Sequence, residues 1–264
     1  MMITLSGRHL SRAWLAVQLA ASDDPARPVL YRAVHIEQFD TGLRLVATDS
    51  FWMSICWAPA VQEDPDAEPH PEPELWRTPT AVATLNDDEW RVRDLFRHVA
   101  KVTKKPTNPD VLVTIDLEHS TYDEAVPTLS PDLAAIRARV MIPGETISVR
   151  TCEVPFPDFR LLLAQFDTAP VGKLESTFSA WMLDRFSRVP KIVGAATITT
   201  TWLDGNRARW HIDTDLTILA PRGVFMDVQR VKGGSATPDD DDEEDDDEGT
   251  VVPFPTPVDR PGGP

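Results

Sequence analysis

Apolar and polar positions follow a pattern that repeats three times along this chain. Each copy begins with a short strand, continues with a helix that has one apolar face, and ends with two or three alternating strands. The first copy predicts strand 2–5, helix 6–20 and strands 29–38, 43–47 and 52–57. The apolar face of its helix consists of Leu10, Ala13, Trp14 and Val17, which recur at helical spacing.

The second copy follows a stretch rich in Pro and acidic residues at 63–74, which we expect to be an exposed loop. Its helix begins near Asn86, Asp87 and Asp88, residue types that cap exposed amide groups. The buried stripe of this helix is Val92, Leu95, Phe96 and Val99. The predicted strands are 76–85, 111–117, 138–142 and 146–152, with an insertion at 119–136.

The third copy is shorter and lies near the C-terminal end of the apolar pattern. It predicts strand 174–179, helix 180–189 and strands 196–203, 208–213 and 217–220. Repeated β-α-β-β-β units of this kind predict an α+β fold in which helices lie on one face of antiparallel sheets.

Composition supports a packed, reduced protein. The chain has 264 residues with eight Trp and ten Phe, enough to bury a substantial core. Cys56 and Cys152 both lie in strand-like stretches, so we expect free, buried thiols and no disulfide framework or metal set. No apolar run is long enough to cross a bilayer, and Arg8 and Arg12 interrupt the N-terminal apolar residues. We therefore expect a cytoplasmic protein without a membrane segment.

Motifs typical of enzymes are missing from the sequence. It has no Gly-rich phosphate loop, no metal-spaced His or Cys cluster and no Ser or Cys nucleophile motif. Several aspartates are candidates for a magnesium site, although most stand at turns, where Asp is favoured locally. They are Asp49, Asp158, Asp204, Asp213 and Asp215. We expect neither an enzymatic activity nor a cofactor.

Three segments of this chain resemble motifs of the sliding-clamp family, the β subunit of bacterial DNA polymerase III, and follow one another in the same order. The family has a run written LRxVATDGHRLA where this chain has residues 43–54, and a run written FPDYRxxLP where this chain has residues 156–162. A later strand-to-helix passage at 177–188, followed by 217–224, is similar to the last half-domain of the family. The resemblance covers roughly residues 1–230 and is that of a shortened, phage-type clamp.

The resemblance implies the DNA-clamp fold and a processivity factor for DNA replication. Such a protein encircles double-stranded DNA without sequence specificity and holds a DNA polymerase through an apolar groove that also receives the clamp loader. It implies a homo-oligomeric ring. The predicted domains are a clamp domain at 1–165, a half-domain or second clamp domain at 166–231, and an acidic tail at 232–264. Three units are an odd count, so either the insertion hides a fourth or a neighbouring subunit completes the half-domain.

The helices of the family line the hole, so basic residues on the predicted helices become DNA-binding candidates. DNA binding without sequence specificity is driven by Lys and Arg, which release counterions from phosphates. The candidates are Arg8, Arg12, Arg93, Arg97, Lys101, Lys104, Arg185 and Arg188. The alternative is that each basic stripe is only the solvated face of its helix.

The second predicted site is the peptide-binding groove implied by the resemblance. Its candidate residues are Thr48, Ser50, Phe51, Trp52, Met53, Pro157, Leu161, Leu162, Ile218, Ala220 and Pro221. Where the family has Gly-His-Arg-Leu, this chain has Ser50-Phe51-Trp52-Met53, which is bulkier and uncharged. The groove is therefore either filled or adapted to a different peptide, and the alternative for these aromatics is ordinary core packing.

The net charge of −16 is concentrated in one place. Asp239 to Glu248 is an unbroken run of ten acidic residues, which leaves −6 for the rest of the chain. We expect this tail to be disordered, because it repels itself and has little apolar surface. It is a solubilising appendage, a competitor of DNA for basic surface, or a carrier of the apolar segment 251–255.

A second function fits the same residues. The chain is alternatively an interaction protein with a clamp fold that closes no ring and binds or diverts a host clamp, polymerase or loader.

Overall fold

The computed structural model describes residues 2–62, 64, 67–86, 90–104, 110–118, 137–142, 145–150, 155–172, 180–203, 207–212 and 219–226. Several predictions lie outside these residues and stay predictions. They are strand 174–179, the insertion at 119–136, the caps Asp87 and Asp88, Cys152, Ile218, the aspartates Asp204, Asp213 and Asp215, and the tail at 232–264.

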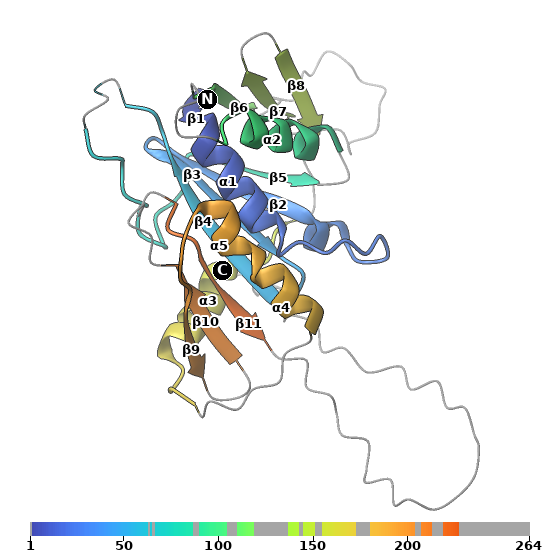
Figure 1. The fold of residues 1–264 in the computed structure, drawn as a ribbon, viewed down its shortest axis with the longest axis vertical. Coiled ribbons are helices and arrows are strands. Elements are labelled where there is room, and N and C mark those ends of the chain that lie inside the picture. The colour runs from blue at the N-terminus through green and yellow to red at the C-terminus, as the bar shows by residue number, and fades with distance from the viewer. Residues whose placement is uncertain are drawn as a thin grey trace, which may run out of the picture.

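Two antiparallel sheets form the frame, and the first two units exchange their first strands (Figure 1). The four-stranded sheet has the order β1 (Met2–Ser6), β6 (Leu112–Glu118), β7 (Arg137–Ile142) and β8 (Glu145–Arg150). The seven-stranded sheet has the order β5 (Ala81–Asn86), β2 (Ala33–Phe39), β3 (Gly42–Thr48), β4 (Trp52–Pro59), β11 (Arg222–Met226), β10 (Arg207–His211) and β9 (Thr199–Leu203). Thus β1 joins the strands of the second unit, and β5 joins those of the first. This reciprocal exchange, which the sequence did not indicate, links the two units into one body, and its α+β class is the one that the repeat predicted.

Four helices gather on one face of the sheets, which we call the helical face (Figure 1). They are α1 (Gly7–Gln18), α2 (Trp90–Val102), α4 (Ala180–Phe186) and α5 (Arg188–Val193). Side chains from all four enter one core cluster, and α1 packs against both α2 and α5. The fifth helix, α3 (Phe159–Thr168), packs on the opposite, outer face against β10 and β11.

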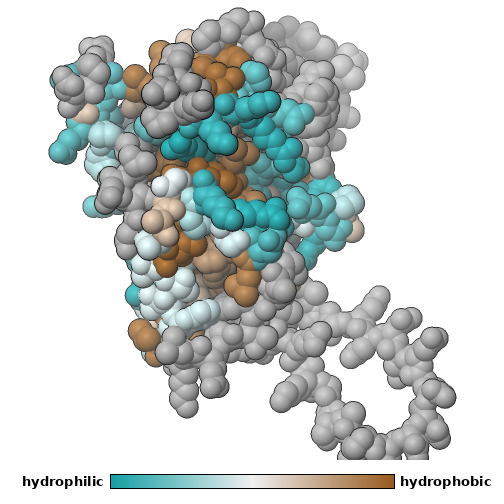
Figure 2. Space-filling view, in the orientation of Figure 1, coloured by the Kyte–Doolittle hydropathy of each residue, from teal (hydrophilic) through white to brown (hydrophobic). Residues whose placement is uncertain are grey.

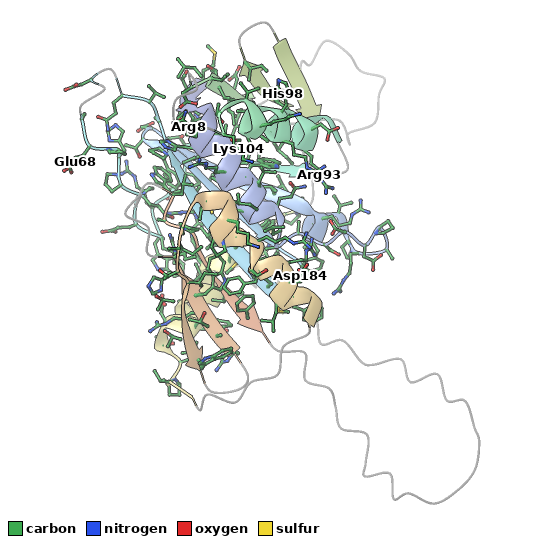
Figure 3. The ribbon with its side chains drawn as sticks, in the orientation of Figure 1. Arg8, Glu68, Arg93, His98, Lys104 and Asp184 are labelled. Atoms are coloured by element: carbon green, nitrogen blue, oxygen red, sulfur yellow. The ribbon has the colours of Figure 1, made fainter. Side chains whose placement is uncertain are left out.

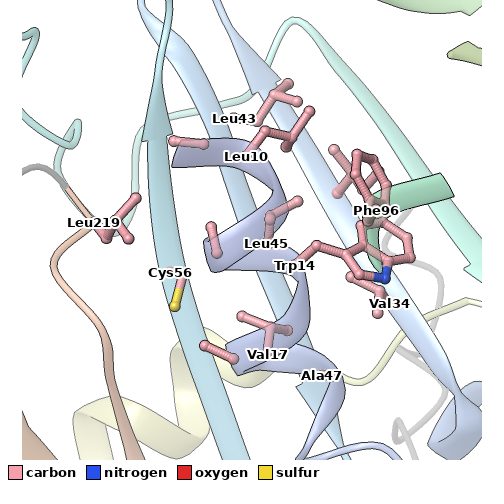
Figure 4. Close-up of a cluster of buried hydrophobic side chains, with 14 of the residues drawn as sticks. Leu10, Trp14, Val17, Val34, Leu43, Leu45, Ala47, Cys56, Phe96 and Leu219 are labelled. Atoms are coloured by element: carbon pink, nitrogen blue, oxygen red, sulfur yellow. The ribbon is translucent and has the colours of Figure 1, made fainter. Parts of the chain in front are cut away.

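The N-terminal helix is held at its start and along its buried side. The Ser6 hydroxyl accepts a hydrogen bond from the His9 backbone N–H at 3.2 Å, which caps α1. Leu10, Trp14 and Val17 are fully buried against β2, β3 and β4 (Figure 4). The Trp14 ring lies 4.8 Å from the ring of Phe96 on α2, so the first two helices share one core.

The third unit is joined to the first by direct pairing of β4 with β11. In this register Trp52 faces Phe225, and Ser54 faces Gly223. A Cβ atom at Gly223 would lie 1.9 Å from the carbonyl oxygen of Met53, so only glycine allows the two strands to approach this closely. Phe225 packs edge to face against Phe186 of α4 with 4.7 Å between the ring centroids. The pairing therefore places the third unit's helices on the same face as α1 and α2.

A buried ion network crosses the outer face. Arg44 on β3 is fully buried and donates to Glu37 at 2.9 Å and to Glu72 at 2.6 Å. Arg222 on β11 also donates to Glu72, at 2.9 Å, and Arg160 on α3 pairs with Glu37. The network thus joins β2, β3, β11 and α3 to the loop that carries Glu72.

That loop, residues 62–80, is only partly the exposed segment that we predicted, and we call it the strap. Arg44 holds it by donating to the carbonyls of Pro73 at 2.7 Å and Glu74 at 3.2 Å. The Trp57 indole donates to the carbonyl of His70 at 2.9 Å. Most described residues of the strap are still solvent-exposed or half-exposed, as predicted. Nothing in the sequence indicated the hydrogen bonds that hold the strap to the sheet.

Several boundaries differ from prediction for identifiable reasons. Residues 29–32 form a short 3₁₀ helix, and the strand begins only at Ala33. The helix expected at 180–189 divides into α4 and α5, because Pro190 has no N–H for a helical bond and its ring clashes with the preceding turn. Strand β5 begins after Pro79, because proline has no backbone N–H to donate to a neighbouring strand.

The end of the chain also departs from prediction at two elements. Strand β11 is Arg222–Met226, and of the strand expected at 217–220 the described residues 219 and 220 lie outside any strand, since Ala220 adopts a φ of 36° that interrupts an extended run. Helix α3 was not predicted, and the expected domain boundary at 165–166 falls within it.

Replacement of Arg44 by Met should lower the free energy of unfolding by about 3 kcal/mol, because the buried carboxylates of Glu37 and Glu72 would each lose their shared cationic partner and keep only the less buried Arg160 and Arg222. Denaturant unfolding measures this loss. The matched control is Arg209→Ala, which removes an exposed pair with Asp167 and should cost about 1 kcal/mol or less. Equal losses in the two variants would contradict the role given to Arg44.

Acid should weaken the same network. Burial by itself raises the pKa of Glu37, but hydrogen bonds from His35 and Arg160 outweigh it and hold the pKa below its ordinary value of 4.5. A carboxylate with a depressed folded-state pKa contributes stability that is present above pH 4.5 and is lost as the pH falls through the folded pKa. Unfolding free energy measured against pH should therefore decline below pH 4.5 and should decline less steeply in Glu37→Gln. Parallel curves would argue against this contribution.

Candidate nucleic-acid interface

The helical face carries positive charge in a strongly acidic chain. The four helices on this face contain nine Arg and Lys residues and only two Asp residues. Their formal charge is therefore +7, whereas the whole chain carries −16. In the space-filling view, hydrophilic side chains gather over the upper part of this layer, and hydrophobic residues are mixed with them lower down (Figure 2).

Arg8 and Arg12 lie one turn apart on α1, and both are half-buried. The Arg8 guanidinium donates to the carbonyl of Thr103 at 3.2 Å, which brings it beside the end of α2. Burial and the neighbouring Arg8 charge lower the pKa of Arg12, and burial together with both arginines lowers the pKa of His9. The start of α1 is therefore a region of positive electrostatic potential, which favours the binding of an anion.

The predicted residues of α2 project from the same layer. Arg97 is 53% exposed and has a long 3.9 Å contact with Asp94, while Lys101 and Lys104 are exposed. Arg93 is half-buried toward the other end of the helix. Arg8 and Lys104 lie near one another where α1 meets α2 (Figure 3). Four of the predicted basic residues thus continue the patch begun by α1.

The two predicted residues of the third unit have different surroundings. Arg185 is largely occupied, since it donates to the carbonyl of Ala21 at 2.8 Å and to Asp23 at 3.0 Å. Arg188 is 57% exposed and pairs with Asp184 one turn earlier. Lys191 on α5 also belongs to the helical face, and the sequence analysis missed it. Its spacing of three residues from Arg188 is the signal that would have found it.

The predicted groove residues divide between the two faces of the sheet. Neighbouring residues of a strand point to opposite faces. Trp52 therefore points into the core of the helical face, where it is fully buried near Phe186 and Phe225. Met53 points to the outer face and is 1% exposed. Trp52 accordingly cannot line an outer groove with Met53, and its place is the one expected of core packing.

Helix α3 fills much of the outer face behind Met53. The outer cluster contains Phe159, Leu163 and Phe166 of α3, with Leu162 packed at its margin. Leu161 points away from this cluster and is 55% exposed. Pro157, just before the helix, is half-buried. Among the predicted groove residues described, Leu161 offers the largest apolar surface to a partner.

The loop from Thr48 to Phe51 is tightly organised. The Asp49 carboxylate accepts from the backbone N–H of Phe51 at 2.9 Å and of Trp52 at 2.8 Å. Ser50 has a φ of 81°, a conformation that favours glycine, which is the residue the clamp family has at this place in its motif. The Arg27 guanidinium lies 5.2 Å from the centroid of the Phe51 ring. The loop is therefore held by hydrogen bonds between the Asp49 side chain and the backbone, and Phe51 is partly covered.

The remaining groove residues lie before β11. Pro221 is buried, and its carbonyl accepts from the Ile212 N–H at 3.0 Å. Ala220 is half-buried. Neither places a large apolar side chain at the surface.

The ionisable groups that the structure describes give no sign of a metal or nucleophile site. Within the described ranges, no three His, Cys, Asp or Glu side chains are grouped closely enough to hold a metal ion. Cys56 is free and fully buried, and burial raises the pKa of its thiol, so the group is unreactive. No described helix is both long and apolar enough to span a membrane.

Comparison with solved structures gives similar folds at low identity. The chain is similar to the DNA polymerase III β subunit of Thermotoga maritima, with 12% identity, a TM-score of 0.50 and coverage of 85% of this chain. It is also similar to the DnaN sliding clamp of Pseudomonas aeruginosa bound to griselimycin, with 13% identity, a TM-score of 0.51 and coverage of 86%. The chain spans 64% of the length of each of these proteins.

No protein-family model matches the sequence, and no curated protein matches it. The paired sheets, the shared helical layer and these structural matches agree with one another. The chain has the sliding-clamp fold.

Proposed function

We propose that this protein is a DNA polymerase processivity factor that encircles duplex DNA with its helical face inward. The observation that carries the proposal is the segregation of charge, because the helices hold +7 in a chain of −16. Duplex DNA presents about one negative charge per 1.7 Å of its axis, so a basic layer of this extent is matched to it.

The chemistry of this face suits binding without sequence specificity. Arg97, Lys101 and Lys104 are exposed charges on long side chains, which reach phosphates and adapt to small displacements. A protein that slides needs contacts of equal strength at every register, and phosphate contacts provide them. We propose no catalytic step and no cofactor, since holding DNA requires neither.

Ring formation is part of the proposal and rests on the sheet edges. Strand β8 is the last strand of its sheet and pairs only with β7 among the described strands. At the far edge of the other sheet, β9 has only an isolated bridge between Leu203 and Val171 on its outer side within the described chain. Exposed strand edges offer backbone donors and acceptors to another chain. We propose that copies of this chain pair at these edges to make a homo-oligomeric ring.

The partners of the outer face would be a DNA polymerase and a clamp loader. Leu161 is an exposed apolar side chain on α3, which Arg160 ties to the strap through the carbonyl of Leu75 at 2.8 Å. A rigidly held apolar residue at a surface is typical of sites where a few anchors supply most of the affinity. A DNA-bound, soluble clamp would act in the cytoplasm of a bacterium or of a phage-infected cell.

The alternative is a clamp-fold protein that closes no ring and binds another clamp, polymerase or loader. It is favoured by the third unit, which pairs with the first unit through β11 and β4 and has no second unit of its own among the described residues. The two functions differ in whether DNA is held topologically.

Charge reversal on the helical face tests the DNA contact. The variant Arg97→Glu, Lys101→Glu, Lys104→Glu should bind a duplex at least about tenfold more weakly at low salt and show a shallower dependence of log K on log salt. The control reverses Arg77, an exposed residue of the strap, and Arg209, a partly exposed residue of β10, and should bind like the unmodified protein. Fluorescence anisotropy of a labelled duplex measures both. Equal weakening in the two variants would show only an effect of net charge.

Replacement of Leu161 by Glu tests the outer anchor. Because the side chain is exposed, the fold should keep its unfolding midpoint, whereas stimulation of a bacterial replicative polymerase in primer extension should fall about tenfold. Val82→Glu is the control, since Val82 is a 39% exposed apolar residue on β5. Undiminished stimulation by the Leu161 variant would place the polymerase site elsewhere.

A further inference from the structure

The chain carries, close to its helical face, a segment of opposite charge. Residues 239–248 carry ten consecutive carboxylates, and the chain from Met226 to this run is twelve residues long, including Gly233-Gly234-Ser235. We propose that this acidic run binds the helical face of its own chain and competes there with DNA.

The point at which the described chain ends favours this contact. Phe225, next to the last residue of β11, lies under Phe186 of α4 with 4.7 Å between the ring centroids. The run is therefore tethered directly beside the layer of helices. Twelve residues span at most about 40 Å when extended. Neighbouring helix axes lie about 8–10 Å apart, so the linker reaches across all the helices of the face.

Charge spacing makes the run an imitation of one DNA strand. An extended peptide advances about 3.3 Å per residue. Along one strand of duplex DNA, phosphates are spaced about 3.4 Å apart. Ten carboxylates in sequence thus present a line of negative charge with nearly the same density as a DNA strand. A basic face that fits one should attract the other.

The face itself is poorly neutralised by its own acids. Within the described part of the chain, Asp94 makes a long 3.9 Å contact with Arg97, and Asp184 is engaged by Arg188. The Asp110 carboxylate accepts from the Arg8 backbone N–H at 3.0 Å at the start of α1. Burial and the charges of Arg12 and Arg8 lower the pKa of His9, although the Asp110 carboxylate acts to raise it. A net positive potential therefore remains for an external or tethered anion.

The consequence is a threshold for DNA binding. A tethered segment has an effective concentration on the order of 1 mM. With a dissociation constant near 0.1 mM it would occupy the face about nine-tenths of the time and weaken DNA binding about tenfold. The bound run would exclude ligands that contact the face through only a few phosphates. A long DNA duplex that covers the whole face would displace the run. The DNA half of this inference rests on the proposed function, but the contact between run and face does not.

The test compares two full-length variants. In the first, the ten acidic residues of the run are changed to Asn or Gln; in the second, Val251, Val252 and Phe254 are changed to Ser, which keeps the charge. The neutralised variant should bind a labelled duplex about tenfold more tightly at low salt, and the difference should shrink as salt rises, because both contacts are ionic. The second variant should bind like the unmodified protein. Unchanged affinity in the neutralised variant, or an equal gain in both, would overturn the proposal.

A second measurement needs no DNA. A labelled peptide with the sequence of residues 239–248 should bind the neutralised protein, and binding should be lost when Arg97, Lys101 and Lys104 are also changed to Glu. No binding to the neutralised protein would overturn the inference. Peptide binding without DNA binding by any variant would instead sustain the contact and contradict the proposed function.

Discussion

The pairing of β4 with β11 is the constraint on which the rest of the structure depends. It joins the first unit to the third across one continuous sheet, with Gly223 at the point where the backbones approach most closely. Its register fixes which residues of both strands face the helices. Phe225 and Trp52 fall on the helical face, while Val224 and Met53 fall on the outer face. One pairing therefore decides the position of α4 and α5 beside α1 and the place of α3 behind them.

The two faces handle charge in opposite ways. On the outer face, Arg44, Glu37 and Glu72 are buried and neutralise one another, which holds the strap and α3 in place. On the helical face, most charges are exposed and of one sign, as at Arg97 and Lys101. Buried ion pairs help to specify one structure, whereas exposed charges of one sign create a potential that attracts a partner of opposite charge. This division, together with the acidic run at 239–248 that carries ten of the negative charges, explains how a chain of net charge −16 can present a cationic surface.

The parts of the fold that depend on local periodicity could be predicted from sequence. The apolar stripe of α1 and the buried residues Leu95, Phe96 and Val99 of α2 are confirmed, because a helix repeats its own face every few residues. The basic residues opposite those stripes followed from the same spacing. The resemblance to sliding clamps likewise agreed with the fold, since its motifs preserve the strand-and-turn pattern around Ser50.

Features that depend on distant partners could not be predicted. Nothing near Glu72 in the sequence indicates that it meets Arg222, 150 residues away. Helix α3 escaped notice because its stability comes from packing on the outer cluster rather than from a strong pattern. The groove assignment failed at Trp52 for a different reason. Strand alternation already requires Trp52 and Met53 to point to opposite faces, so that signal was present.

The central claim is that the helical face surrounds DNA, and retention on closed DNA tests it most directly. Protein loaded on a nicked circular plasmid should remain with the DNA through gel filtration at a salt concentration that breaks ionic contacts. The protein should be released when the plasmid is cut once. Release from circular and cut plasmid alike would contradict encirclement and would favour the open, partner-binding protein instead.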